Sequence, residues 1–178
     1  MKHAADIPVI ETERLRLRGF AMRDYEAVAA YKADPDVMRY TGGPEDRYRA
    51  WKSFTAMAGT WNVLGFGYFC IADKQTDACL GHSALLQPPE WPDREVGYTL
   101  ARGAHGKGYA VEAASAVLRF AYEHMGWTTA VSVIDPQNRA SQNVARKMGA
   151  LLERENEPVW DFRADIWRHQ PPERFLAS

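Results

Sequence analysis

The sequence predicts a mixed α+β fold in which a mostly antiparallel central sheet is flanked by helices. Two observations carry this prediction. The chain has 178 residues, of which 46% are hydrophobic, so it is long enough to bury one sizeable core. Short segments of strand periodicity also alternate with segments of helical periodicity, without a repeat or a linker between them. We therefore expect a single domain over residues 1–178.

The first elements are a strand and two helices. Over Glu13–Arg18 charged residues alternate with leucines, and this period of two places both leucines on one face of a strand. Asp24 is expected to cap a helix that ends near Lys32. A second helix is expected over Glu45–Ala58, where large apolar residues recur at helical spacing.

Three strands and a long helix follow. The strand-like segments Phe66–Ala72, Cys79–Leu86 and Glu95–Leu100 are separated by polar turns, which is typical of an antiparallel meander. The next helix is mostly apolar and is expected to run to Met125, where Gly126 ends it. Its polar residues recur at intervals of three and four and form one stripe: Glu112, Ser115, Arg119 and Glu123.

The last third contributes a strand, a short helix and two more strands. Thr129–Ile134 is rich in β-branched residues, and Asn138 is expected to cap a helix that Gly149 closes. Strands are then expected over Leu151–Glu155 and Val159–Trp167. The expected order is β, α, α, β, β, β, α, β, α, β, β.

Charge and cysteine content exclude several classes of protein. Twenty-two basic against 23 acidic residues leave a net charge of −1, so no global field attracts nucleic acid or an anionic membrane. Two cysteines are too few for a disulfide framework, and Cys79 with His82 lacks the second pair that a zinc site needs. Met1–Pro8 has no apolar segment, and no run of about 18 apolar residues occurs. We expect a cytoplasmic protein without a metal, a membrane or a nucleic-acid partner.

A glycine-rich segment precedes the long helix. Ala101–Ala110 holds three glycines and no acidic residue, so its backbone N–H groups suit a phosphate or pyrophosphate. It is not a Walker loop, because Gly108 follows Lys107 where Ser or Thr is required, and it is not a Rossmann fingerprint, because Val111 occupies the third glycine position. A plain connecting turn and a nucleotide-binding loop remain alternatives.

Several segments agree in order and spacing with one known family. In chain order they are Glu11–Arg18, Asp34–Met38, His105–Ala113, Asp135–Ser141 and Lys147–Gly149. Together they resemble the GNAT superfamily of N-acetyltransferases, and within it the ribosomal-protein N-terminal acetyltransferase branch, the RimJ/RimL type. The resemblance covers about residues 11–167.

This resemblance implies a GNAT-like domain with splayed central strands and acetyl-CoA as cosubstrate. The strand Tyr98–Leu100 would diverge from Val131–Val133 to admit the acetyl-pantetheine arm, and the loop would cradle the pyrophosphate. His105 stands where the family's motif has Gln or Arg. The implied cosubstrate-binding residues are Tyr98, Thr99, Leu100, His105, Gly106, Lys107, Gly108, Tyr109, Ala110, Asn138 and Ser141.

Two residues are candidates for proton transfer. Glu95 lies where the resemblance places a carboxylate that relays the proton of the amine through water, although an exposed strand-end glutamate would fit the sequence equally. Many GNAT enzymes have a tyrosine general acid at the position of Ala145. Ser141 or a bound water remains for that role, with a plain helix-start serine as the alternative.

The acceptor is expected to be a primary amine, either a protein α-amine or a small molecule, acetylated by direct transfer in a monomer or homodimer. A non-catalytic acyl-CoA-binding or regulatory module on the same fold is the alternative function. Two further groups of residues stay open. The cationic residues of the helix after Asn138 either bind the 3′-phosphate of the coenzyme or form a solvated face. Four aromatic residues belong either to the core, which is favoured, or to an acceptor pocket. These residues are Arg139, Arg146 and Lys147, and Trp51, Phe54, Trp61 and Trp91.

Overall fold

The computed structural model describes residues 6–177, and the chain divides into two compact units. Unit 1 comprises the chain up to Ala84 together with Tyr98–Ala113, and unit 2 comprises Leu85–Gly97 together with the chain from Ala114 onward. The expectation of a single domain over residues 1–178 includes residues 1–5 and 178, which lie outside the described residues, as does most of Met1–Pro8.

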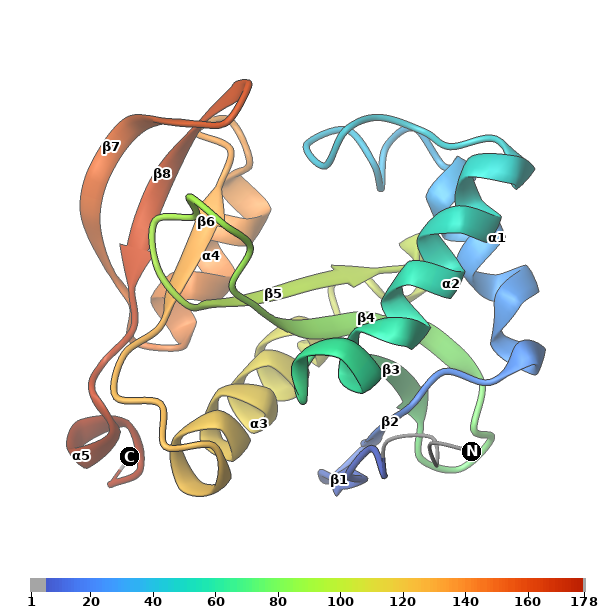
Figure 1. Cartoon of the computed structure of the whole chain (residues 1–178), viewed down its shortest axis with the longest axis horizontal. Coiled ribbons are helices and arrows are strands. Elements are labelled where there is room, and N and C mark those ends of the chain that lie inside the picture. The colour runs from blue at the N-terminus through green and yellow to red at the C-terminus, as the bar shows by residue number, and fades with distance from the viewer. Residues whose placement is uncertain (1–5, 178) are drawn as a thin grey trace. The chain divides into compact units, whose positions relative to one another are not determined.

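Unit 1 combines antiparallel strands with two adjacent helices (Figure 1). Buried leucines in β2 confirm the alternation predicted for the opening strand. The helices α1 and α2 enclose a core of Val28, Tyr31, Phe54 and Met57. The elements are β1 (Ile10–Glu11), β2 (Leu15–Arg18), α1 (Tyr25–Ala33), α2 (Arg47–Leu64), β3 (Tyr68–Asp73) and the first part of β4 (Cys79–Leu86).

The helix starts of unit 1 differ from the sequence prediction. Asp24 precedes α1, but its side chain makes no capping hydrogen bond. Its carboxylate instead accepts from both terminal nitrogens of buried Arg18, at 2.7 and 2.9 Å. A buried guanidinium needs a charged partner more than a helix end needs a cap, because the helix end can be solvated. The predicted cap is therefore wrong, although the helix exists.

The second helix is longer than the pattern predicts. Asp46 caps α2 by accepting from the backbone N–H of Arg49 at 2.8 Å. The helix passes Ala58 and ends at Leu64, because Gly65 takes the left-handed conformation with φ of 75°.

Unit 2 contains a three-stranded antiparallel segment with a helix on one face (Figure 1). Asn138 caps α4 as predicted, by accepting from the N–H of Ser141 at 3.1 Å. The elements of unit 2 are β6 (Val131–Ile134), α4 (Arg139–Lys147), β7 (Leu151–Val159), β8 (Phe162–Arg168) and α5 (Pro172–Phe175). Two strands and a helix extend through both units: β4, β5 (Glu95–Leu100) and α3 (Tyr109–His124).

The hydrogen-bonded strand order is β1-β2-β3-β4-β5-β6-β8-β7. Strands β5 and β6 run parallel, with Glu95 opposite Val131, whereas the pairs β1–β2, β2–β3, β3–β4, β6–β8 and β7–β8 are antiparallel. The predicted α+β class with a mixed, mostly antiparallel sheet is confirmed. The elements β1 and α5 escaped prediction because two and four residues are too short to show a period.

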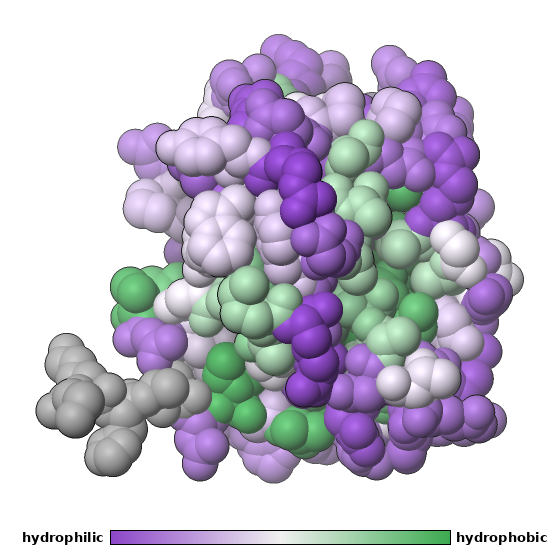
Figure 2. Space-filling view, turned by 90° about the vertical axis from the view of Figure 1, so that its right-hand side faces the viewer, coloured by the Kyte–Doolittle hydropathy of each residue, from purple (hydrophilic) through white to green (hydrophobic). Residues whose placement is uncertain are grey.

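One face of the molecule has a mixed polarity. Figure 2 looks from the side that carries α1 and shows hydrophilic residues around a smaller apolar area. Among residues 6–177, no helix combines the length and the apolar character needed to cross a membrane.

The cap of α2 provides a test of local stability. Asp46→Ala is expected to lower the unfolding free energy by about 1 kcal/mol, because the N–H of Arg49 loses its acceptor. Asp46→Asn keeps an acceptor oxygen and should retain most of the stability. Urea unfolding of both variants measures the difference, and equal losses would show that the side chain does not act as a cap.

Candidate active site

The glycine loop belongs to unit 1 and leaves its backbone open to a ligand. Gly106 and Gly108 have φ of 74° and 82°, a conformation that L side chains rarely adopt. A Cβ atom at Gly106 would meet nothing within 4 Å, and one at Gly108 would meet only a guanidinium nitrogen of Arg14, at 3.4 Å. The loop leads into α3, a helix of 16 residues whose first N–H groups favour an anion. These features fit a pyrophosphate.

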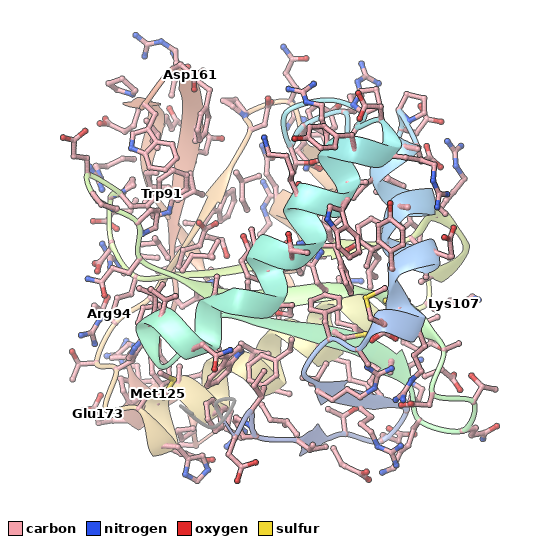
Figure 3. The ribbon with its side chains drawn as sticks, turned by 45° about the vertical axis from the view of Figure 1, so that its right-hand side comes forward. Trp91, Arg94, Lys107, Met125, Asp161 and Glu173 are labelled. Carbon is pink, nitrogen blue, oxygen red and sulfur yellow. The ribbon has the colours of Figure 1, made fainter. Side chains whose placement is uncertain are left out.

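Arg14 holds the loop in place. Its Nη1 donates to the carbonyl oxygen of Lys107 at 2.8 Å, and its guanidinium lies over the ring of Tyr109 at 4.7 Å. Lys107, labelled in Figure 3, is exposed. Arg14 thus occupies a carbonyl group of the loop, and the N–H of His105 donates to the carbonyl oxygen of Arg102 at 3.1 Å.

Glu112 in turn holds Arg14. Its Oε2 accepts from Nε of Arg14 at 2.8 Å, and its Oε1 accepts from the hydroxyl of Thr12 at 2.6 Å and from the backbone N–H of Arg14 at 2.9 Å. Partial burial raises the pKa of Glu112, but these donors outweigh it and bring the net pKa below its usual value. This residue, predicted as part of a polar stripe, connects the N-terminal segment to the start of α3.

His105 takes a role that the motif did not indicate. Its Nε2 lies 2.9 Å from the carbonyl oxygen of Leu100, so the ring ties the loop to the end of β5. The neighbouring residues of β5 are also tightly placed, because a Cβ at Gly81 would lie 2.1 Å from the carbonyl oxygen of Thr99. Tyr98 is half-buried.

Glu95 belongs to unit 2 and is buried at 6% exposure, so the exposed alternative is wrong. Its Oε2 accepts from Nε1 of Trp91 at 2.8 Å, and its Oε1 accepts from the backbone N–H of Val133 at 3.1 Å. Burial raises the pKa of Glu95 to about 7, against the opposing effect of the hydrogen bonds from Val133 and Trp91. The carboxyl therefore titrates near neutral pH, where a general base works best.

The ladder between β5 and β6 is interrupted next to this carboxylate. Glu95 pairs with Val131, whereas the N–H of Val133 goes to the side chain of Glu95. The hydroxyl of Ser132 donates to the carbonyl oxygen of Val96 at 3.0 Å. Side chains thus replace ladder bonds from this point in unit 2. The expected divergence of Tyr98–Leu100 from Val131–Val133 concerns residues of different units and stays a prediction.

Helix α4 carries polar groups at its start and a buried alanine near its end. The side-chain oxygen of Asn138 is used as the helix cap, and Ser141 is half-buried in the first turn. Ala145 is fully buried in a cluster with Ile134 and Trp167. A tyrosine could not replace Ala145 without displacing this core, which explains the departure from the motif.

The aromatic residues that belong either to the core or to an acceptor pocket differ in exposure. Phe54 and Trp61 are buried, as predicted for core residues, whereas Trp51 is 40% exposed. Trp91 contacts the candidate catalytic carboxylate instead, a contact that the sequence did not predict. The cations of α4 are exposed, and the guanidinium of Arg146 lies over the ring of Trp167 at 4.7 Å.

One cluster has the residue types of a metal site. In the part of the chain that the structure describes, Asp24, Cys70 and Cys79 bring ligand atoms within 4.8 Å of one another. Arg18 already neutralises Asp24. The hydrogen bond with Cys79, together with burial, raises the pKa of the Cys70 thiol, which disfavours the thiolate that a metal requires.

Comparison with known proteins gives the class of the protein. Residues 14–151 match the family model described as an acetyltransferase (GNAT) domain. An acetyltransferase from Agrobacterium tumefaciens has a solved structure with a TM-score of 0.83 and 35% identity, covering 93% of this chain and 95% of that one. A protein of Bacillus subtilis named uncharacterized N-acetyltransferase YnaD is 28% identical over 81% of this chain and 83% of its own.

This chain belongs to the GNAT acetyltransferase family. A solved structure of RimL, a ribosomal L7/L12 α-N-protein acetyltransferase in complex with coenzyme A, has a TM-score of 0.73. It is 16% identical and covers 91% of this chain and 96% of that one. At this identity the likeness shows the shared fold and leaves the RimJ/RimL branch a prediction.

Gly108→Ala tests the loop. The variant is expected to lose stability, because alanine is strained at positive φ. It is also expected to bind acetyl-CoA at least about tenfold more weakly, because relief of the strain and crowding against Arg14 move the backbone N–H groups of the loop. Gly126→Ala is the matched control: Gly126 follows the same helix, has φ of 64°, and has open space around it.

Isothermal titration with acetyl-CoA and thermal unfolding measure the two effects separately. Similar destabilisation of both variants with weaker binding only in Gly108→Ala is expected. Unchanged affinity in folded Gly108→Ala would make the loop a plain connection.

Proposed function

We propose that this protein is an acetyl-CoA-dependent N-acetyltransferase that transfers the acetyl group directly to a primary amine. The observation that carries the proposal is the buried carboxylate of Glu95, which titrates near pH 7 and accepts from two N–H donors among residues 6–177. A carboxylate has about four lone-pair positions, so this one retains capacity for a water or an amine.

In this proposal the loop from His105 to Ala110 binds the pyrophosphate of acetyl-CoA. The proposal is supported by the open space around the backbone at Gly106 and Gly108. Arg14 holds the carbonyl group of Lys107 in this loop, and Glu112 orients Arg14. Arg139, Arg146 and Lys147 contribute positive charge for the 3′-phosphate, which is consistent with their exposure. The remaining coenzyme contacts proposed from the family motif are Tyr98, Thr99, Leu100, Asn138 and Ser141.

Proton transfer defines the role of Glu95. An acceptor amine is mostly ammonium at neutral pH, and it must become neutral before its nitrogen can attack. Glu95 takes this proton through a water, the nitrogen attacks the thioester carbonyl carbon, and the carbon–sulfur bond breaks as the amide forms. The nitrogen passes its second proton to solvent water. The departing thiolate receives a proton from Ser141 or a bound water, and solvent then returns a proton to that group. No covalent enzyme intermediate is needed.

The acceptor in this proposal is a primary amine, either a protein α-amine or a small-molecule amine. We also propose one functional domain, a cytoplasmic location, a monomer or homodimer, and the RimJ/RimL-like branch. The family match and the N-acetyltransferase name of the YnaD relative favour an enzyme over a non-catalytic acyl-CoA-binding module.

Acetyl-CoA is expected to stabilise the folded protein, because a ligand that binds only the folded state shifts the unfolding equilibrium. At about 100 times its dissociation constant the gain is about 2.7 kcal/mol. Thermal scans with acetyl-CoA, and with ATP as the control, measure it. A shift with ATP alone would support a nucleotide-binding protein and contradict the proposal.

Glu95→Gln is expected to lower turnover about 10²- to 10⁴-fold at pH 7 while acetyl-CoA affinity stays nearly unchanged. The amide keeps the shape and removes the base. Raising the pH should recover part of the loss, because more amine is already neutral. The pH profile of kcat/KM, followed by CoA release, should lose its group with a pKa near 7 only in this variant.

Glu90→Gln makes the same chemical change at an exposed glutamate of the preceding loop and is the control. If Glu95→Gln keeps the activity and pH profile of the control, Glu95 is not the base and solvent accepts the proton.

A further inference from the structure

We infer that the acceptor is an amine bearing an aromatic ring and no carboxylate, held by an aromatic wall formed by Trp91, Trp160 and Phe162. This inference rests on the proposed function and assigns the substrate class of the same site. All three residues lie in unit 2, with Glu95.

The wall joins the loop before β5 to the tip of the β7–β8 hairpin. The rings of Trp91 and Trp160 meet edge to face with centroids 4.9 Å apart, and Phe162 lies 5.9 Å from Trp91. Nε1 of Trp160 donates to the carbonyl oxygen of Pro89 at 3.3 Å. Figure 3 shows Trp91 on its loop beside the hairpin that ends at Asp161. The two segments therefore hold the rings in place from both sides.

Part of the wall remains available to a ligand. Trp160 is 59% exposed and Phe162 is 42% exposed, although both touch Trp91. Trp160 also takes φ of 50°, an unfavourable conformation for a large side chain. Two exposed rings in a fixed arrangement offer edges and faces to a third ring, and such contacts add to the gain from burying apolar area.

Trp91 connects the wall to the proposed base. Its indole packs against the cluster of Val131, Val159, Ala164 and Ile166, and its Nε1 donates to Glu95. A ring seated on Trp160 and Phe162 is thereby next to the side chain that holds the carboxylate. The wall is continuous with the proposed proton acceptor, which favours a substrate over an unrelated partner.

Charge selects among aromatic amines. Within residues 151–163, Glu153 pairs with Arg168 at 2.7 Å and Glu157 pairs with Arg154 at 3.8 Å. These pairs leave Glu155 and Asp161 against Arg163, and Asp161 stands between Trp160 and Phe162 in the sequence. The excess of negative charge favours an approaching ammonium group and disfavours an acceptor that also carries a carboxylate. The best acceptor is therefore an arylalkylamine, and not an aromatic amino acid.

The test compares initial rates of CoA release with six amines. Two are arylalkylamines, 2-phenylethylamine and tryptamine, and hexylamine lacks the ring. Phenylalanine adds a carboxylate, and spermidine and a peptide with a free N-terminal alanine represent other acceptor classes. The two arylalkylamines are expected to exceed hexylamine and phenylalanine about tenfold or more in kcat/KM.

Trp160→Asn removes the ring, and asparagine tolerates positive φ better than other side chains. This variant should raise KM for 2-phenylethylamine about tenfold, leave kcat within about twofold, and change hexylamine little. Leu151→Ala is the matched control, because Leu151 is 66% exposed at the other end of β7, opposite Arg168.

Three results would overturn the assignment while leaving the proposed function intact. They are equal rates with hexylamine, activity only with spermidine or the peptide, and a Trp160→Asn variant with parental KM. Sedimentation that shows a dimer lost in Trp160→Asn would also overturn it and make the wall an interface between copies. CoA release with none of the amines would instead overturn the proposed function, and the acceptor assignment with it.

Discussion

The burial of one carboxylate constrains the structure of unit 2. An ionised carboxylate removed from water is costly unless donors satisfy it, and Glu95 has the indole of Trp91 and the N–H of Val133. The N–H of Val133 is thereby withheld from the strand ladder where β5 pairs in parallel with β6. The hydrogen bond that keeps Glu95 buried and the interruption of the ladder are therefore the same feature.

The same burial couples the chemistry to stability. The unfolded carboxyl titrates near pH 4.5 and the folded one near 7, so the folded state binds the proton more tightly. The stability that this preference contributes is fully present below pH 4.5 and is lost as the pH rises through about 7. The free energy of unfolding is therefore lower at neutral pH than at acidic pH, and the same burial gives the proposed base a pKa near the working pH.

In unit 1 a comparable constraint applies to the loop that is proposed to bind the pyrophosphate. A loop that offers its N–H groups to a ligand must hold its carbonyl groups elsewhere, and Arg14 takes the one of Lys107. Glu112, 98 residues away in sequence, orients Arg14. The cation that supports the loop is thereby neutralised within the protein, so an anion meets mainly backbone dipoles.

Local periodicity predicted most of the elements and the character of the loop, because alternation and glycine placement are properties of neighbouring residues. The strands around Leu15 and the cap at Asn138 are examples. Pairings across long distances were not predictable in this way. Asp24 had the pattern of a cap, and only the fold supplied Arg18 as its partner. Glu95 fitted an exposed strand end equally well, until Trp91 and Val133 were placed around it.

The central claim is that Glu95 is a buried carboxyl poised near neutral pH. A titration of glutamate side-chain carboxyl carbons by NMR, with the Glu95 signal assigned from its loss in Glu95→Gln, tests it without any acceptor. The account predicts a midpoint near pH 7 for this signal. A midpoint near 4.5, the value of an ordinary glutamate, would contradict the burial of the carboxylate and its role as base.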